Sequence, residues 1–215
     1  MLISPSIASA DVLHIADEVK YIDKYFDNIH IDIEDGVAVG GISFGMKMAK
    51  GICGISVSSE KTMHLEVLNP LDYLEDVLTC NCDVTFIQVS HLKDPLAVID
   101  RFKKAGVKTG VNLCDEDLVR PERNELIRVC DNILVNTTAH WDVEQNYMPQ
   151  MEKFALELAE DERKKIWIDG CVTYDTYQRL KDSRIYCAVV GRGIFADKQL
   201  AVQRYCQRKE VENVR

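Results

Sequence analysis

The chain has 215 residues, of which 47% are hydrophobic, and it carries a formal net charge of −9 with a sequence pI of about 5.1. This apolar fraction is typical of a globular protein and excludes disorder as the default state. An acidic chain without a basic run binds nucleic acid and membrane surfaces poorly, so we expect neither as a partner. A small anionic substrate stays compatible with the charge, because one pocket can be positive on an acidic protein.

The N-terminal residues and the cysteines indicate the compartment. Met1-Leu2-Ile3-Ser4-Pro5 reaches a proline before an apolar core forms, so we expect no secretory signal. No apolar run approaches the roughly 18 residues of a membrane-spanning helix. The eight cysteines include no C-x-x-C pair, and we expect buried small hydrophobic residues rather than disulfides or metal ligands. The expected location is a reducing cytoplasm.

Eight short β-rich runs alternate with helical patterns along the chain, and several are apolar on both faces, as buried parallel strands are. The candidate strands are Leu2–Ser4, Asn28–Ile33, Thr62–Leu65, Val84–Val89, Lys108–Asn112, Ile133–Thr137, Ile166–Ile168 and Ala188–Val190. About 27 residues per strand–helix unit favours an α/β fold of the TIM-barrel type, a single (β/α)8 domain over residues 1–215. The alternative is an open doubly wound sheet, but no G-x-G-x-x-G follows the first candidate strand.

Signals for helix starts and ends lie between these strands. Asp11 is a candidate N-cap for a helix with Val12, Ile15, Val19 and Ile22 on one face. Asn69-Pro70 and Asp94-Pro95 each place a capping side chain before a proline at the first helical position. Lys103-Lys104-Ala105-Gly106 predicts a helix end, with cations in the last turn and a glycine beyond it. The last two helices are expected at Tyr174–Leu180 and Gln199–Gln207.

Polar residues gather where three candidate strands end, which is where a barrel carries its active site. His30, Asp32 and Glu34 are spaced by two and therefore point to one side of their strand, as His64 and Glu66 do on the next. Asp169-Gly170 ends a third strand. Imidazole and carboxylate ligands suit zinc, iron, manganese or cobalt. A strand histidine is more often an ordinary core or surface residue, and from spacing alone both interpretations stay open.

At these residues the sequence resembles the ribulose-phosphate 3-epimerase family and its hexulose-phosphate relatives. The similarity covers most of the chain as an ordered set of motifs. These are Ser4-Pro5-Ser6-Ile7-Ala8-Ser9-Ala10-Asp11, His30-Ile31-Asp32-Ile33-Glu34-Asp35-Gly36, His64-Leu65-Glu66 with Asn69-Pro70, Ile168-Asp169-Gly170, and Val189-Val190-Gly191-Arg192-Gly193-Ile194-Phe195. A chance match of all of them in this order is improbable.

The resemblance implies a metal-dependent epimerase of a pentulose or hexulose phosphate. One divalent ion is held by residues matching His30, Asp32, His64 and Asp169, and Asp32 and Asp169 match the pair that passes the C3 proton through an enediolate. The implied substrate-binding residues are Ser6, His64, Gly170, Gly191 and Arg192. The resemblance also implies a homo-oligomer and a role in carbohydrate metabolism, including the pentose phosphates.

The sequence departs from the family at the residues expected near the substrate. The family's glycine-rich phosphate loop is replaced by Thr138-Ala139-His140-Trp141-Asp142-Val143-Glu144-Gln145, which has no glycine. Arg192 stands in place of a serine and is a candidate phosphate clamp, with pairing to a nearby carboxylate as the alternative. Methionines of the family correspond to Glu34 and Glu66, and to Val135. We interpret Glu34, Glu66 and His140 as specificity candidates.

Two other functions remain alternatives. The first is an epimerase or isomerase of the same barrel type that acts on an unphosphorylated or otherwise modified sugar, which the altered phosphate loop favours. The second is a barrel without catalysis that serves as a binding protein, against which the four converging ligands argue.

Overall fold

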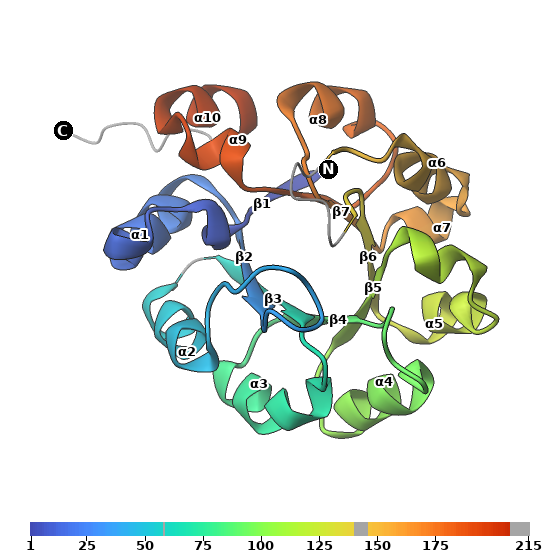
Figure 1. The fold of residues 1–215 in the computed structure, drawn as a ribbon. Coiled ribbons are helices and arrows are strands. Elements are labelled where there is room, and N and C mark those ends of the chain that lie inside the picture. Colours follow the sequence, from blue (N-terminus) through green and yellow to red (C-terminus); the bar gives the residue numbers. More distant parts are fainter. Residues whose placement is uncertain (58, 140–145, 207–215) are drawn as a thin grey trace.

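The computed structural model describes residues 1–57, 59–139 and 146–206 and shows a ring of parallel strands surrounded by helices (Figure 1). The strands are β1 (Leu2–Pro5), β2 (Asn28–Glu34), β3 (Glu60–Glu66), β4 (Val84–Gln88), β5 (Thr109–Leu113), β6 (Asn132–Asn136), β7 (Ile166–Asp169) and β8 (Cys187–Val190). They form one sheet in the order β1-β8-β7-β6-β5-β4-β3-β2. A parallel bridge between Ser6 and His30 brings its two edges together. All eight expected strands are confirmed, and so is the TIM-barrel class.

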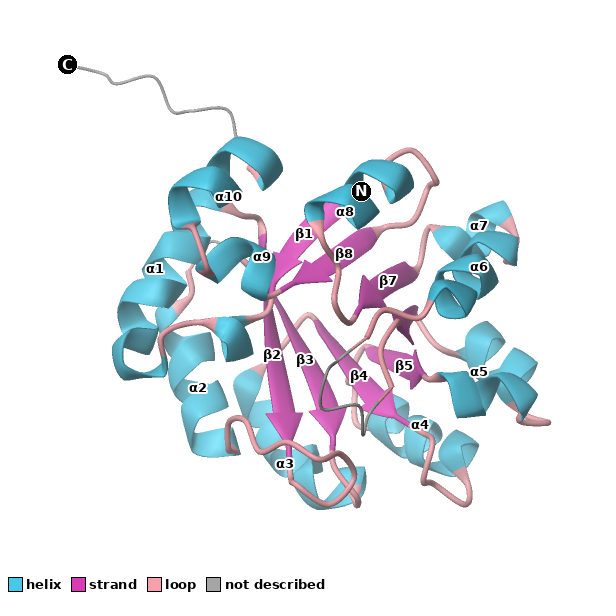
Figure 2. Cartoon of the chain, turned by 45° about the horizontal axis from the view of Figure 1, so that its top comes forward, coloured by secondary structure: helices cyan, strands magenta, loops and turns pink. Residues whose placement is uncertain are grey.

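The helices form an outer layer around the magenta strands (Figure 2). They are α1 (Ile15–Tyr25), α2 (Met46–Ile55), α3 (Leu74–Cys80), α4 (Pro95–Lys104), α5 (Arg123–Val129), α6 (Pro149–Glu157), α7 (Glu160–Arg163), α8 (Tyr174–Leu180), α9 (Arg192–Phe195) and α10 (Lys198–Tyr205). Short 3-10 turns lie at η1 (Ile7–Ser9), η2 (Val12–His14), η3 (Pro70–Tyr73) and η4 (Asp115–Val119). No helix in the described part of the chain is both long and apolar enough to cross a membrane.

The expected helix signals are mostly confirmed. The Asp94 carboxylate accepts a hydrogen bond from the Ala97 N–H at 3.0 Å at the start of α4, and Gly106 follows its end with φ +89°. Asp11 caps a 3-10 turn rather than a helix, so Val12 lies outside α1 and is 56% exposed. Its expected place on the packed face is therefore wrong. Asn69 precedes the turn η3 without a side-chain cap.

Side chains alternate between the inside of the barrel and the layer under the helices. The inward cluster contains Val84, Phe86, Leu134, Trp167, Cys187 and Val189. The rings of Phe86 and Trp167 pack edge to face with centroids 5.3 Å apart, and His30 lies above both, 6.2 and 6.5 Å away. Gly110 makes room for this packing, since a Cβ there would lie 2.3 Å from Phe86 Cδ1. Aromatic side chains therefore fill the barrel below the polar residues at its mouth.

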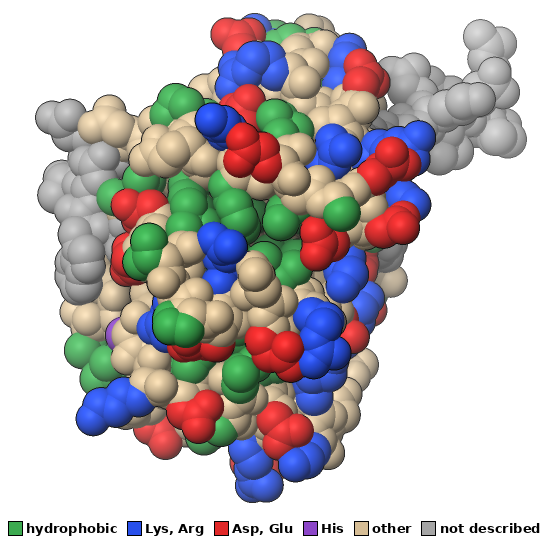
Figure 3. Space-filling view, turned by 90° about the vertical axis from the view of Figure 1, so that its right-hand side faces the viewer, with side chains coloured by type: hydrophobic (Ala, Val, Ile, Leu, Met, Phe, Trp, Pro, Cys, Tyr) green, Lys and Arg blue, Asp and Glu red, His purple; other side chains and the backbone are tan. Residues whose placement is uncertain are grey.

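Basic and acidic side chains are intermixed on the face that Figure 3 turns toward the viewer. Some charged side chains form ion pairs between residues three positions apart, such as Arg128 with Glu125 and Lys164 with Asp161. None of the eight cysteines, all within the described residues, forms a disulfide in this structure. Burial is confirmed only for Cys80, Cys114, Cys130 and Cys187, and is wrong for Cys53, Cys82, Cys171 and Cys206, which are partly exposed.

Candidate active site

Strands β2, β3 and β7 bring two histidines and two aspartates together at the mouth of the barrel. Adjacent register places Asp32 beside His64 and His30 beside Thr62. The His30 Nε2 lies 3.2 Å from Asp32 Oδ1 and 3.7 Å from Asp169 Oδ2. The His64 Nδ1 lies 3.4 Å and 3.7 Å from the same two oxygens. The structure therefore brings together the four residues that the sequence singled out.

A chain of hydrogen bonds fixes the orientation of the His30 ring. The Thr62 hydroxyl donates to the Ile29 carbonyl at 3.1 Å, so its oxygen is left to accept a proton from another group. The His30 Nδ1–H donates to that oxygen at 2.9 Å. Because Nδ1 donates to Thr62, Nε2 is the nitrogen that faces Asp32 and Asp169, and it offers a lone pair to a cation once its own proton has left.

The two aspartates are each held by one oxygen, which leaves the other facing the imidazoles. The Ser6 hydroxyl donates to Asp32 Oδ2 at 2.6 Å, and the Gly170 N–H donates to Asp169 Oδ1 at 2.7 Å. Burial raises the pKa of Asp32, but the histidines outweigh it and hold that pKa well below its usual range. Burial, opposed by His30 and reinforced by Asp32, raises the pKa of Asp169 to about 6. The two carboxylates therefore differ in proton affinity.

Two glutamates stand beside this cluster, at the ends of β2 and β3. Glu34 and Glu66 are direct neighbours in the parallel register, and Glu66 Oε1 lies 3.3 Å from His64 Nδ1. Burial, together with the two aspartates, raises the pKa of Glu34 to about 7. Burial also raises the pKa of Glu66 well above its ordinary value. Side-by-side carboxylates repel one another, so these two glutamates lower the stability of the fold unless a proton or a partner offsets their charge.

The loop after β2 holds Glu34 in place. The Glu34 N–H donates to the Ser43 hydroxyl at 3.0 Å, and that hydroxyl donates to the Asp32 carbonyl at 2.5 Å. Gly41 lies against the carboxylate, since a Cβ there would be 2.6 Å from Glu34 Oε2. The loop thus aims the glutamate into the pocket instead of leaving it on the surface.

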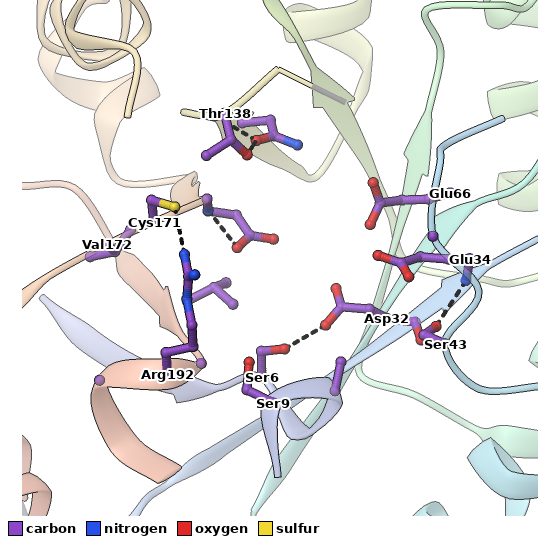
Figure 4. A pocket seen from close by; sticks show the side chains of 18 of the residues that line it. Ser6, Ser9, Asp32, Glu34, Ser43, Glu66, Thr138, Cys171, Val172 and Arg192 are labelled. Atoms are coloured by element: carbon purple, nitrogen blue, oxygen red, sulfur yellow. Dashed lines mark hydrogen bonds between the residues drawn. The ribbon is translucent and has the colours of Figure 1, made fainter. Parts of the chain in front are cut away.

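A cavity of about 800 Å³ opens above the cluster, and Figure 4 shows Asp32, Glu34 and Glu66 on one side of it and Arg192 on the other. The Arg192 Nη2 donates to Cys171 Sγ at 3.0 Å. Within the described residues this is the guanidinium's hydrogen bond, and no pairing of Arg192 with a carboxylate is found there. Gly170 and Gly191 line the same cavity, and a Cβ on Gly191 would lie 2.2 Å from Ser9 Oγ.

The sequence misplaced one pocket residue and missed others. Val135 packs in the apolar layer outside the strands, whereas its neighbour Asn136 lines the cavity. Asn136 Oδ1 accepts hydrogen bonds from the N–H and the hydroxyl of Thr138, at 3.0 and 2.9 Å. Cys171 gave no sequence signal. The specificity candidate His140 lies outside the described residues.

The four-residue cluster fits a metal ion by its own chemistry. The ligand atoms of His30, Asp32, His64 and Asp169 all lie within 4.8 Å of one another. The His30 Nε2 is buried and has no hydrogen-bond partner in the described part of the chain. Buried polar atoms are normally satisfied, so ring nitrogens and carboxylates that converge in this way fit a cation between them.

The sequence and the fold both have known relatives. The family model described as "Ribulose-phosphate 3 epimerase family" matches residues 2–195. The ribulose-phosphate 3-epimerase of Synechocystis sp. is 26% identical over 205 residues, covering 91% of this chain and 87% of the relative. The Chlamydia pneumoniae protein of the same name is 23% identical, covering 94% and 91%.

Solved structures support the fold alone. The phosphoribosyl anthranilate isomerase from Thermococcus kodakaraensis has a TM-score of 0.67 at 13% identity, covering 95% of this chain and 96% of that one. The tryptophan synthase A-subunit from Pyrococcus furiosus has the same TM-score at 10% identity, with 95% of each chain covered. The family model matches nearly the whole length of the chain, and this match, together with the two ribulose-phosphate 3-epimerases named above, confirms the expected isomerase class. The chain belongs to the ribulose-phosphate 3 epimerase family.

Proposed function

We propose that this protein is a metal-dependent sugar-phosphate 3-epimerase, in which Asp32 and Asp169 move the C3 proton of a pentulose or hexulose phosphate. The observation that carries the proposal is the convergence of two imidazole nitrogens and two carboxylate oxygens at the floor of the cavity, in a group that is buried except for the partly exposed Asp169. The curated relatives bear the name ribulose-phosphate 3-epimerase, which supports the same substrate class.

His30, Asp32, His64 and Asp169 would hold the ion, and zinc, iron, manganese and cobalt all accept such a donor set. When bound, a divalent ion polarises the ketose carbonyl and so makes the neighbouring C–H more acidic. Inversion requires a proton to leave one face of the carbon and return to the other. Asp32 and Asp169 enter the cavity from β2 and β7, which β1 and β8 separate in the sheet, and they are suited to serve opposite faces.

The remaining lining residues bind and orient the substrate. Arg192 offers a bidentate guanidinium to an anionic group at the rim, beside the backbone of Gly191 and Gly170. Ser6 holds Asp32 and lies within reach of a substrate hydroxyl. His64 is buried below the cavity lining, and its role toward the substrate rests on the family resemblance alone.

Glu34 and Glu66 set the specificity in this proposal. Their carboxylates accept hydrogen bonds from sugar hydroxyl groups, or pair with a cationic substituent, at the end of the cavity away from Arg192. His140 remains a third candidate. A same-barrel epimerase acting on an unphosphorylated or modified sugar is the second candidate function, and the glycine-free segment 138–145 favours it.

The test is proton exchange measured with protein of known metal content. Ketopentose and ketohexose phosphates, and the corresponding free sugars, are incubated in D2O and followed by proton NMR. Deuterium at C3 together with the epimer is the expected result. Asp32→Asn and Asp169→Asn should each abolish it, while the exposed Asp72→Asn should not.

Other results would change the assignment. Near-normal turnover in either aspartate variant contradicts the proton-transfer roles. Exchange with the free sugars alone supports the second candidate, and a protein with neither metal nor exchange supports a binding protein without catalysis. The homo-oligomer implied by the resemblance stays a prediction, which size-exclusion chromatography can check. The cytoplasmic location expected from the composition also stays a prediction, which cell fractionation can check.

A further inference from the structure

Three cysteines gather on the outside of the barrel, far from the cavity. Cys53 lies near the end of α2, Cys80 ends α3, and Cys82 lies two residues before β4. The chain enters β3 and β4 directly after these segments, so the thiols lie at the end of the barrel opposite the strand termini that carry the site. The sulfurs of Cys53 and Cys82 are 3.7 Å apart, and both residues are partly exposed, whereas Cys80 is buried.

The arrangement favours a bond between two thiols over a metal centre. The described residues contain one group of three or more ligand atoms that all lie within 4.8 Å of one another, and it is the histidine–aspartate cluster. The three sulfurs therefore do not converge on a common point. We propose that Cys53 and Cys82 are a site of covalent modification, at which a disulfide oxidant joins the end of α2 to the segment after α3.

Little movement is needed to form the bond. A disulfide requires sulfurs about 2.05 Å apart, so each sulfur has to move by roughly 0.8 Å, within reach of small side-chain rotations. The left-handed Asn81, with φ 49°, turns the chain between α3 and Cys82. Cys82 follows this turn, and its sulfur lies against that of Cys53 in α2.

The chemistry is a thiol–disulfide exchange with a small disulfide such as oxidised glutathione. The hydrogen bond to Cys80 lowers the pKa of Cys53, but Cys82 and burial outweigh it and bring that pKa to about 12. This raised pKa disfavours the Cys53 thiolate, so the exchange is written with Cys82 as the first nucleophile. Its thiolate attacks one glutathione sulfur, the S–S bond breaks, and one glutathione thiolate leaves. The sulfur of Cys53 then gives its proton to solvent, attacks Cys82, and releases the second glutathione. Two protein thiols are oxidised and one disulfide is reduced to two thiols.

The bond should stabilise the fold without entering the active site. It closes a loop between residues 29 positions apart, which predicts a rise in Tm of about 8 °C for a chain of this size. Metal binding and C3 exchange should not change, because neither thiol lies near the cavity. This inference does not depend on the proposed function.

The experiment treats the full chain with oxidised glutathione and maps its tryptic peptides without reduction. Trypsin releases residues 51–61 with Cys53, and 62–93 with both Cys80 and Cys82, so the variants must decide which thiol is joined. The linked peptide is expected in the wild type and in Cys80→Ser, with the rise in Tm reversed by dithiothreitol. Cys53→Ser and Cys82→Ser should lack both, and alanine variants replace them if they fail to fold.

Three results would overturn the inference. These are a linked peptide that persists in Cys82→Ser, a bridge within peptide 62–93, and glutathione adducts that never resolve to a protein disulfide.

Discussion

Replacing Thr62 by valine tests the metal site through a residue that would not touch the metal. Valine has nearly the shape of threonine, so the change removes the hydroxyl and its bonds to His30 and to the Ile29 carbonyl without opening a large gap between β2 and β3. The change removes the oxygen that accepts the His30 Nδ1–H at 2.9 Å. In the metal-free variant the ring proton is expected to move to Nε2, where Asp32 Oδ1 lies 3.2 Å away.

The loss of metal affinity follows from that movement. Binding an ion returns the proton to Nδ1, where it is buried without an acceptor, at a cost of about 1–3 kcal/mol. Hydrogen-bond partners of metal-bound histidines are typically worth about 10–100-fold in affinity, or roughly 1.4–2.7 kcal/mol. The two energies agree, and we expect Thr62→Val to weaken metal binding by about 10–100-fold.

The assay is a titration of chelator-stripped protein with Zn²⁺ in competition with a chromophoric chelator. Thr85→Val is the matched control, because Thr85 is fully buried in β4 and its hydroxyl has no hydrogen-bond partner in the described residues. It should leave the affinity unchanged. An affinity of Thr62→Val within twofold of wild type, or an equal loss in Thr85→Val, would refute the reasoning.

Three further predictions concern packing and the substrate. Gly110→Ala should lower the free energy of unfolding by about 1–3 kcal/mol in urea, because its Cβ would meet Phe86 at 2.3 Å. Gly51→Ala, in α2 with nothing within 4 Å, should raise it by up to about 1 kcal/mol, and equal effects would contradict this account. Arg192→Ala should raise KM for a phosphorylated sugar about tenfold or more while metal content is retained, and an unchanged KM would remove Arg192 from the phosphate site. Glu66→Gln should change the relative kcat/KM among sugars in a substrate panel, and an unaltered ranking would exclude it as a specificity residue.

The sequence predicted the strands and four site residues because spacing by two fixes which side chains share a strand face. The spacing alone placed His30 and Asp32 on one face of a strand. The predicted barrel then placed Asp169, at the end of another strand, at the same mouth. The role of Thr62 was not predictable, since a strand threonine gives no sign of which neighbour it bonds. Contact between Cys53 and Cys82 depends on the packing of α2 against the end of α3, which no local pattern encodes.

Val135 shows why the direction of alternating side chains has to be known separately for each strand. The resemblance to a family methionine placed it near the substrate, but β6 directs its even-numbered residues inward, as Leu134 in the barrel core and Asn136 at the cavity show. A shift of one residue exchanges the two faces of a strand, so resemblance alone cannot settle which residue lines a pocket.

The charges in the cavity restrict how an anionic sugar can lie in it. Asp32, Glu34 and Glu66 occupy one side and Arg192 the other (Figure 4). A phosphate beside the glutamates would meet like charge in a poorly solvated site, whereas beside Arg192 it gains a charge-assisted bidentate contact. A ketose phosphate is therefore expected to bind with its phosphate at Arg192 and its hydroxyl groups toward Glu34 and Glu66. In this orientation Arg192 supplies a phosphate contact that does not depend on a glycine-rich loop, which keeps a phosphorylated sugar compatible with the proposed function.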